Sequence, residues 1–170
     1  LRLAFVQHRA LAVGLKGVQT ERTLSDVFDQ AGDGDSLIKM RDLDLLVGSG
    51  GVLSHAPRRL QTAAMLIDAF QPEGITRLAV DSIFMMPHLG VLSSVNEVAA
   101  TQVFERDCLI YLGTCVAPIG SGKPGATCAE YDITLPEGKH SGSLQVGELL
   151  RFPLAAEAEA RIEIRPARGF

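Results

Sequence analysis

A short apolar run that ends in consecutive small residues places the strongest constraint on how this chain can fold. Leu43 to Val47 is apolar apart from one aspartate, and the segment Gly48 to Gly51 reads Gly-Ser-Gly-Gly. The first predicts a buried strand and the second a tight turn, because glycine adopts unusual backbone conformations at little steric cost. An apolar helical pattern then runs from Leu60 to Phe70, with Pro57 expected in its first turn. We therefore predict a strand, a glycine turn and a helix over residues 43 to 70.

The alternation of strand and helix continues along the chain. Thr76 to Val80 and Leu109 to Val116 are further apolar segments that predict strands. Between them, Ser94-Val-Asn-Glu97 has the spacing of a capping box, which predicts a helix that runs to about Arg106. Strands that alternate with helices favour an α/β fold with a parallel or mixed sheet and flanking helices.

The first residues have the pattern of an amphipathic helix over residues 1 to 13 that ends near Gly14. A loop is expected at Ala31 to Asp35, where glycine and aspartate alternate. The chain begins inside this helical pattern without a signal peptide, and it ends without a helix cap or a polar tail, so we expect it to be a piece of a longer polypeptide. The predicted apolar face of the helix consists of Leu3, Val6, Ala10 and Val13.

The composition changes after Pro118, where the segment Gly120 to Gly125 is rich in glycine and helical periodicity stops. We predict a boundary here between an α/β domain of residues 1–117 and a small all-β extension of residues 118–170. The alanine and glutamate run from 155 to 160 is also compatible with a helix. The strands expected in the extension are Tyr131 to Leu135, Ser143 to Phe152 and Ala160 to Arg165.

Charge and composition argue against two classes of partner. Lys plus Arg number 16 and Asp plus Glu number 20, and the resulting net charge of -4 does not favour binding to nucleic acid. No apolar run approaches the roughly 20 residues that a membrane-spanning helix needs.

The three cysteines, Cys108, Cys115 and Cys128, lack the spacing of a zinc site or a disulfide framework, which fits the reducing conditions of the cytoplasm.

The glycine segment is also the best candidate for a binding site. Backbone without side chains can lie against a flat ligand or a phosphate, and the start of a helix favours an anion. The motif lacks the dinucleotide-binding fingerprint because its sixth position is Leu53, so a turn that only packs strand against helix stays an alternative. His55 follows the glycines closely enough to contact a ligand.

A second glycine-rich motif, Gly120-Ser-Gly122-Lys123, fails as a phosphate loop, since Pro124 replaces the required Ser or Thr. It is expected to be an exposed turn.

The run Leu-Leu-Val-Gly-Ser-Gly-Gly-Val-Leu-Ser-His-Ala-Pro, from Leu45 to Pro57, resembles the MutL or GlmL family of glutamate mutase accessory proteins. This family is unrelated to the mismatch-repair protein of similar name. Leu78-Ala-Val-Asp81 is similar to a strand of the family that ends in aspartate, and Pro87-His-Leu-Gly-Val-Leu-Ser93 is similar to its small-residue helix. Residues 117–170 resemble the β-rich extension of longer members.

The resemblance implies half of an actin-like (ribonuclease H-like) ATPase fold, in which two lobes close over ATP or ADP and magnesium. Magnesium would be held mainly by the other lobe, whose phosphate hairpin does not occur in this sequence, so we do not expect the chain alone to hydrolyse ATP and assign it no catalytic residue. The implied partner is an adenosylcobalamin-dependent glutamate (methylaspartate) mutase, which such a protein would reactivate by releasing damaged cofactor. The implied adenosine contacts are Gly48, Ser49, Gly50 and Gly51, with Val52 beneath the turn and with His55, a position at which relatives differ.

Two other functions stay open from the sequence. One is a protein-interaction module of the mutase system that binds no nucleotide, suggested by the change of composition after Pro118 and by Phe152 and Leu154, which flank a proline. The other is a self-contained enzyme, although no nucleophile, metal-binding cluster or acid–base pair stands out.

Overall fold

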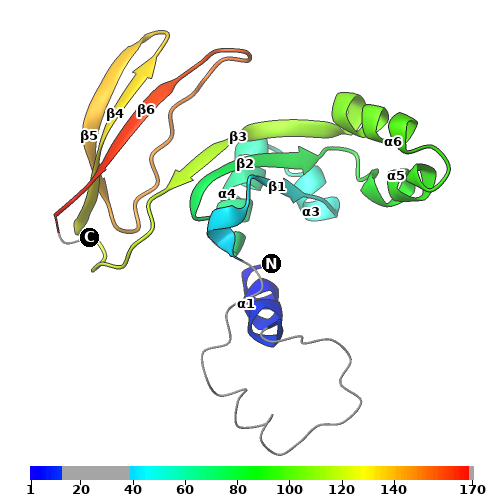
Figure 1. The fold of residues 1–170 in the computed structure, drawn as a ribbon, viewed down its shortest axis with the longest axis horizontal. Helices are drawn as coiled ribbons and strands as arrows, with labels where there is room; N and C mark the ends of the chain where they lie inside the picture. Colours follow the sequence, from blue (N-terminus) through cyan, green and yellow to red (C-terminus); the bar gives the residue numbers. More distant parts are fainter. Residues whose placement is uncertain (13–38, 169–170) are drawn as a thin grey trace, which may run out of the picture. The chain divides into compact units, whose positions relative to one another are not determined.

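The computed structural model describes residues 1–12 and 39–168. The loop predicted at Ala31 to Asp35, together with Val13 and Gly14 at the end of the first predicted helix, lies outside the described residues. The chain divides into two compact units, Leu1–Ala117 and Pro118–Phe170 (Figure 1).

The first unit is built on a mixed sheet of three strands in the order β1-β2-β3. β1 (Leu45–Gly48) is parallel to β2 (Gly74–Asp81), and β3 (Leu109–Ala117) is antiparallel to β2. The predicted α/β class and mixed sheet are therefore confirmed. Because β1 and β2 are parallel and Gly48 is in register with Val80, the glycine turn after β1 and the end of β2 lie at the same edge of the sheet.

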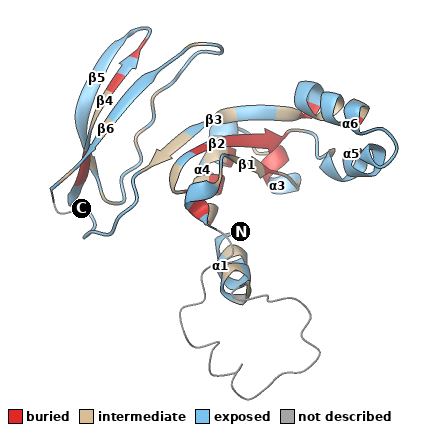
Figure 2. Ribbon diagram, in the orientation of Figure 1, coloured by how far each residue is buried: buried red, intermediate tan, exposed pale blue. Residues whose placement is uncertain are grey.

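Two helices follow β1 directly. α3 (Gly51–Ser54) is a single turn, and α4 (Arg59–Phe70) packs on the sheet, where Leu66 joins Leu53 of α3 and Val80 of β2 in the core. Figure 2 shows these buried segments grouped around β2.

The predicted details of α4 need two corrections. The predicted apolar face began with Leu60, but that side chain is 51% exposed, because the face turned toward the sheet carries Thr62, Leu66 and Ala69. Pro57 lies outside the first turn, since the helix begins after its N-cap residue Arg58.

α1 (Arg2–Leu11) contacts α4 through the ring of Phe5, whose centroid lies 4.9 Å from that of Phe70. The predicted apolar face of this helix is wrong, since Leu3 and Val6 are 86% and 57% exposed. The side that meets α4 is set by this aromatic contact, and an exposed ion pair also joins Arg2 to Asp68 at 3.6 Å.

A helical hairpin lies between β2 and β3. It consists of α5 (Met86–Ser93) and α6 (Glu97–Val103), and the π-helical turn η2 (Phe104–Cys108) connects it to β3. The capping residue predicted for α6 was Ser94, but its hydroxyl donates to the carbonyl of Val91 instead. Asn96 caps the helix, because its side-chain oxygen accepts a hydrogen bond from the amide of Ala99 at 3.0 Å.

The second unit is an antiparallel sheet of three strands in the order β5-β4-β6. Its strands are β4 (Thr127–Leu135), β5 (Gly138–Gln145) and β6 (Arg161–Pro166), which agrees with the predicted β-rich extension. The strand predicted over Ser143 to Phe152 is misplaced, since β5 runs from Gly138 to Gln145 and overlaps the prediction only at residues 143–145. The Phe152 ring packs instead against Tyr131 of β4, with 5.7 Å between the ring centroids. Residues 155–160 form neither a helix nor a strand.

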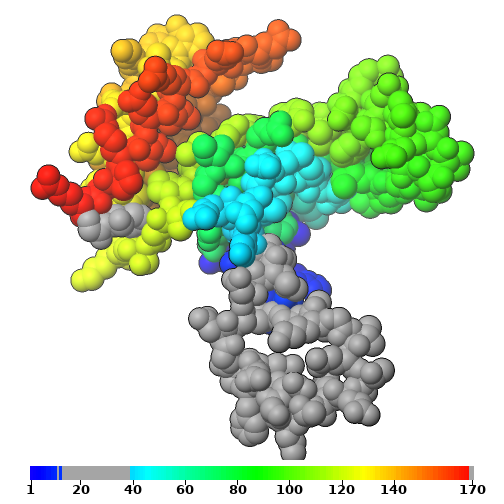
Figure 3. All heavy atoms as spheres, in the orientation of Figure 1, coloured from blue at the N-terminus to red at the C-terminus, as the bar shows by residue number. Residues whose placement is uncertain are grey.

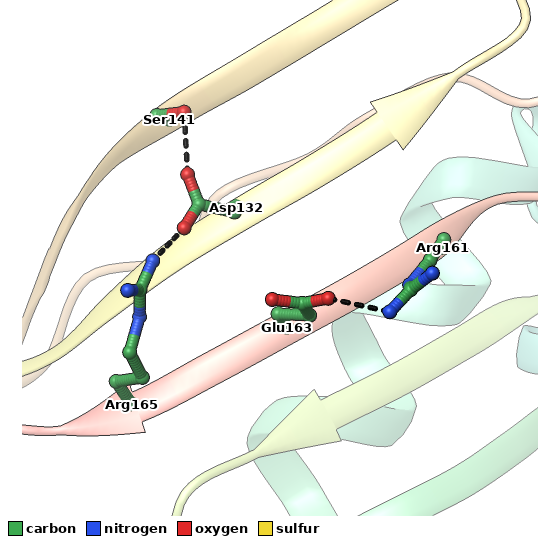
Figure 4. A network of polar contacts seen from close by, with 5 residues as sticks. All are labelled: Asp132, Ser141, Arg161, Glu163 and Arg165. Carbon is green, nitrogen blue, oxygen red and sulfur yellow. Dashed lines mark hydrogen bonds and ion pairs between the residues drawn. The ribbon is translucent and has the colours of Figure 1, made fainter.

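One face of this sheet carries polar contacts that involve all three strands, with the charged side chains on β4 and β6 and a serine on β5 (Figure 4). Asp132 of β4 accepts a hydrogen bond from Ser141 of β5 and forms an ion pair with Arg165 of β6, and Arg161 pairs with Glu163 at 2.8 Å. These side chains are substantially exposed, so the pairs contribute little to stability.

Candidate functional site

The three glycines of the turn after β1 have different structural roles. Gly48 is buried, and a Cβ at this position would lie 3.1 Å from side-chain carbons of both Leu53 and Leu66. Gly50 has φ 103°, a value that side chains disfavour. Gly51 has neither constraint, because a Cβ there would meet no atom within 4 Å. Glycine at position 48 therefore allows close packing, glycine at position 50 allows the backbone conformation, and Gly51 is bare, open backbone.

Asp81, the last residue of β2, is fully buried beside this turn. Its Oδ1 accepts the amide of Met85 at 3.1 Å, and its Oδ2 accepts the amide of Met86 at 2.9 Å. Oδ2 also accepts the hydroxyl of Ser49, at 3.1 Å. One carboxylate thus joins the glycine turn to the start of α5.

These donors keep Asp81 ionised in a buried position. Burial by itself would raise the pKa of the carboxyl, since it disfavours the charged form. The hydrogen bonds from the amides of Met86 and Met85, the hydroxyl of Ser49 and the amide of Ile83 together outweigh burial and lower the pKa below its ordinary value of 3.8.

α3 is held at its end by three hydrogen bonds. The buried hydroxyl of Ser54 donates to the backbone carbonyl of Asp81 at 2.5 Å. From α4, Thr62 donates its hydroxyl to the carbonyl of Leu53 at 2.9 Å, and Arg59 donates to the carbonyl of Ser54 at 2.9 Å. The turn and the helix that follows it are therefore fixed from two sides, by β2 and by α4.

The two remaining predicted site residues are both exposed. Val52, expected beneath the turn, is 72% exposed, and Leu53 occupies the buried position instead because α3 turns its Leu53 side toward Leu66 and Val80. His55 lies at the end of α3, where its Nδ1 is 3.2 Å from the carbonyl oxygen of Gly51.

The predictions from sequence omitted Asp81 and Ser54 from the site. The sequence feature that could have identified Asp81 is a predicted strand that ends in aspartate. The ends of neighbouring parallel strands meet at one edge of the sheet, where ligands of open α/β sheets bind. The assembled groups are open backbone, the hydroxyls of Ser49 and Ser54, and one ionised carboxylate, and the hydroxyls and the carboxylate are already hydrogen-bonded. Such groups can bind and orient a ligand, and within residues 1–12 and 39–168 no cluster of three His, Cys, Asp or Glu is placed to hold a metal ion.

The part of the chain that the structure describes contains no helix with both the length and the apolar character needed to cross a bilayer. In comparisons with known proteins, the family model described as MutL protein matches residues 1–108. The match includes the glycine turn, Asp81 and the α5–α6 hairpin, whereas β3 and the second unit lie beyond it. No curated protein and no solved structure matches the chain.

Proposed function

The chain belongs to the MutL protein family, whose model matches residues 1–108 of its 170, and from this premise we propose that its first unit binds the adenosine part of ATP or ADP. The observation that carries the proposal is the open backbone at Gly51, beside a buried, ionised aspartate at the shared edge of two parallel strands. An edge of this kind is where open α/β sheets bind nucleotides.

Each residue of the turn would have a different role in nucleotide binding. Gly51 would admit the flat base or the ribose, and Ser49 would supply a side-chain hydrogen-bonding group from the same turn. Gly48 serves packing and supports the ligand only indirectly, because its Cα faces Leu53 and Leu66. Phosphates and magnesium would be held by another lobe of an actin-like fold.

The proposed biological role is that of an accessory protein to adenosylcobalamin-dependent glutamate mutase. A nucleotide that binds a closed arrangement of two lobes more tightly than an open one shifts the protein toward closure. Hydrolysis or exchange of the nucleotide would reverse that shift, and the cycle would drive release of damaged cofactor from the mutase.

Substitution of Gly51 tests the nucleotide site without disturbing the fold. Gly51→Val adds a side chain into open space, so a loss of affinity would report on the ligand and not on protein packing. We expect the affinity for a non-hydrolysable ATP analogue, measured by titration calorimetry in the full-length protein, to fall at least tenfold, or about 1.4 kcal/mol. Gly50 is a poorer probe, since any side chain there is strained at φ 103°.

Gly90→Val is the matched control for Gly51→Val. Gly90 lies in α5, and a Cβ there also meets no atom within 4 Å. The control should keep the affinity of the unmodified protein. Unchanged affinity in a folded Gly51→Val protein would rule out the turn as the nucleotide site.

A second candidate function is a protein-interaction module of the mutase system, and the α5–α6 hairpin favours it. Figure 3 shows this hairpin, in green, as the outer end of its unit. Val91, Val95 and Val98 are 72%, 85% and 67% exposed, which is unusual for a group of apolar side chains. If a mutase subunit binds here, Val95→Asp should abolish its retention on immobilised protein, whereas Leu149→Asp, at an exposed position of the second unit, should not. Equal retention by both variants would exclude the hairpin.

A further inference from the structure

Ser49 is the one residue of the turn Gly48 to Gly51 whose side chain can form a hydrogen bond, and its hydroxyl is already hydrogen-bonded within the protein. The hydroxyl donates to Oδ2 of Asp81 at 3.1 Å, and Ser49 itself is half-buried. A hydroxyl has one hydrogen to donate and two lone pairs that accept. Once the hydrogen points to Asp81, the Ser49 oxygen offers a ligand only an acceptor.

The acceptor Asp81 is itself held in place by the start of the next helix. Its two oxygens accept the amides of Met85 and Met86, and its backbone carbonyl accepts the hydroxyl of Ser54. The carboxylate cannot rotate toward another donor without breaking these bonds. The orientation of Ser49 is therefore determined by a residue that lies 32 positions further along the chain.

We propose that Asp81 is the positioning residue of the nucleotide site, which fixes Ser49 as an acceptor for a donor group on the ligand. The donor can be a ribose hydroxyl or an amino group of the base. This inference rests on the proposed nucleotide-binding function and adds to it the residue that sets the polarity of the one side-chain contact in the turn. It also makes the turn and α5 a single hydrogen-bonded piece, so that α5 would follow any displacement of the turn.

A double-mutant cycle tests the proposal. Ser49→Ala removes the ligand contact, and Asp81→Asn weakens its orientation, because the amide offers a single acceptor oxygen and can turn its NH2 group toward Ser49. We expect each variant to bind the non-hydrolysable ATP analogue about five- to tenfold more weakly, and the double variant to bind about as weakly as the weaker single variant. If the fold-loss of affinity in the double variant equals the product of the two single fold-losses, the residues act independently and the proposal is overturned.

Ser93→Ala is the matched control, because it removes an exposed serine hydroxyl of α5 that donates to the backbone carbonyl of Gly90 and not to Asp81. Its affinity for the analogue should be unchanged. If Asp81→Asn fails to fold, equal affinities of Ser49→Ala and Ser93→Ala are enough to overturn the proposal. Failure of the proposed function looks different, since the unmodified protein would then bind no analogue at all.

Discussion

At the scale of single residues, Asp81 shows how a buried charge is kept without a neighbouring cation in its hydrogen-bond set. Its donors are two amides from the start of α5, the amide of Ile83 and one hydroxyl. Hydrogen bonds to the charged form favour ionisation, and here they outweigh the opposing effect of burial. The pKa of this carboxyl is consequently lower in the folded protein than in the unfolded chain.

This difference in pKa predicts how acid changes stability. Because the folded-state pKa lies below the ordinary value of 3.8, the ionised Asp81 stabilises the fold above that pH, and the contribution is lost as pH falls through the folded-state pKa. The difference in free energy of unfolding between the unmodified protein and Asp81→Asn should be constant from neutral pH to about pH 5 and shrink below about pH 4. Urea denaturation at a series of pH values measures it.

The exposed Asp44 provides the comparison for loss of one carboxylate, as Asp44→Asn. A stability difference between the unmodified protein and Asp81→Asn that stays constant or grows in acid would contradict the assignment of these hydrogen bonds to the ionised form.

At the scale of helices and strands, the apolar pattern was enough to predict where most elements lie. β1, β2, β3 and α4 all occur where runs of apolar residues predicted them, because burial of such runs is the main favourable contribution to folding. The single-turn α3 escaped prediction, since four residues are too few to show a helical period.

The faces of the helices could not be predicted, because a face is chosen by its neighbour. α1 has apolar residues on several sides, and it is the ring of Phe70 that selects Phe5 over Leu3 and Val6. The prediction of the residue that caps α6 was wrong for a similar reason. Ser94 and Asn96 are both good capping residues, but the Ser94 hydroxyl is occupied at the end of α5.

Only part of the candidate site could be predicted from the sequence. The glycine turn is continuous in sequence and was identified directly, whereas Asp81 joins it through the parallel register of β1 with β2. The separate roles of Gly48, Gly50 and Gly51 also required the structure, since the sequence does not show which glycine faces Leu66.

At the scale of the whole molecule, each unit has a core of its own. Leu53, Leu66 and Val80 form the core cluster of the first unit, and Ala129, Ile133 and other buried residues of β4 lie in the second. Units with separate cores can open independently, because disrupting one core leaves the apolar contacts of the other intact.

Gly142→Ala tests this independence. Gly142 of β5 lies opposite Tyr131 of β4, and an added Cβ would come within 2.7 Å of the tyrosine oxygen and 2.9 Å of Cζ, so the tyrosine side chain, which packs against Phe152, must shift. Because Gly142 is exposed and the crowded atoms lie at the outer end of a half-buried side chain, we expect a loss of stability of about 0.5–1 kcal/mol. Hydrogen–deuterium exchange should become faster in β4, β5 and β6 and stay unchanged in β1, β2 and β3. Leu66→Ala, which leaves a cavity in the core of the first unit, should give the reverse pattern. Faster exchange in both units from either substitution would mean that they unfold together.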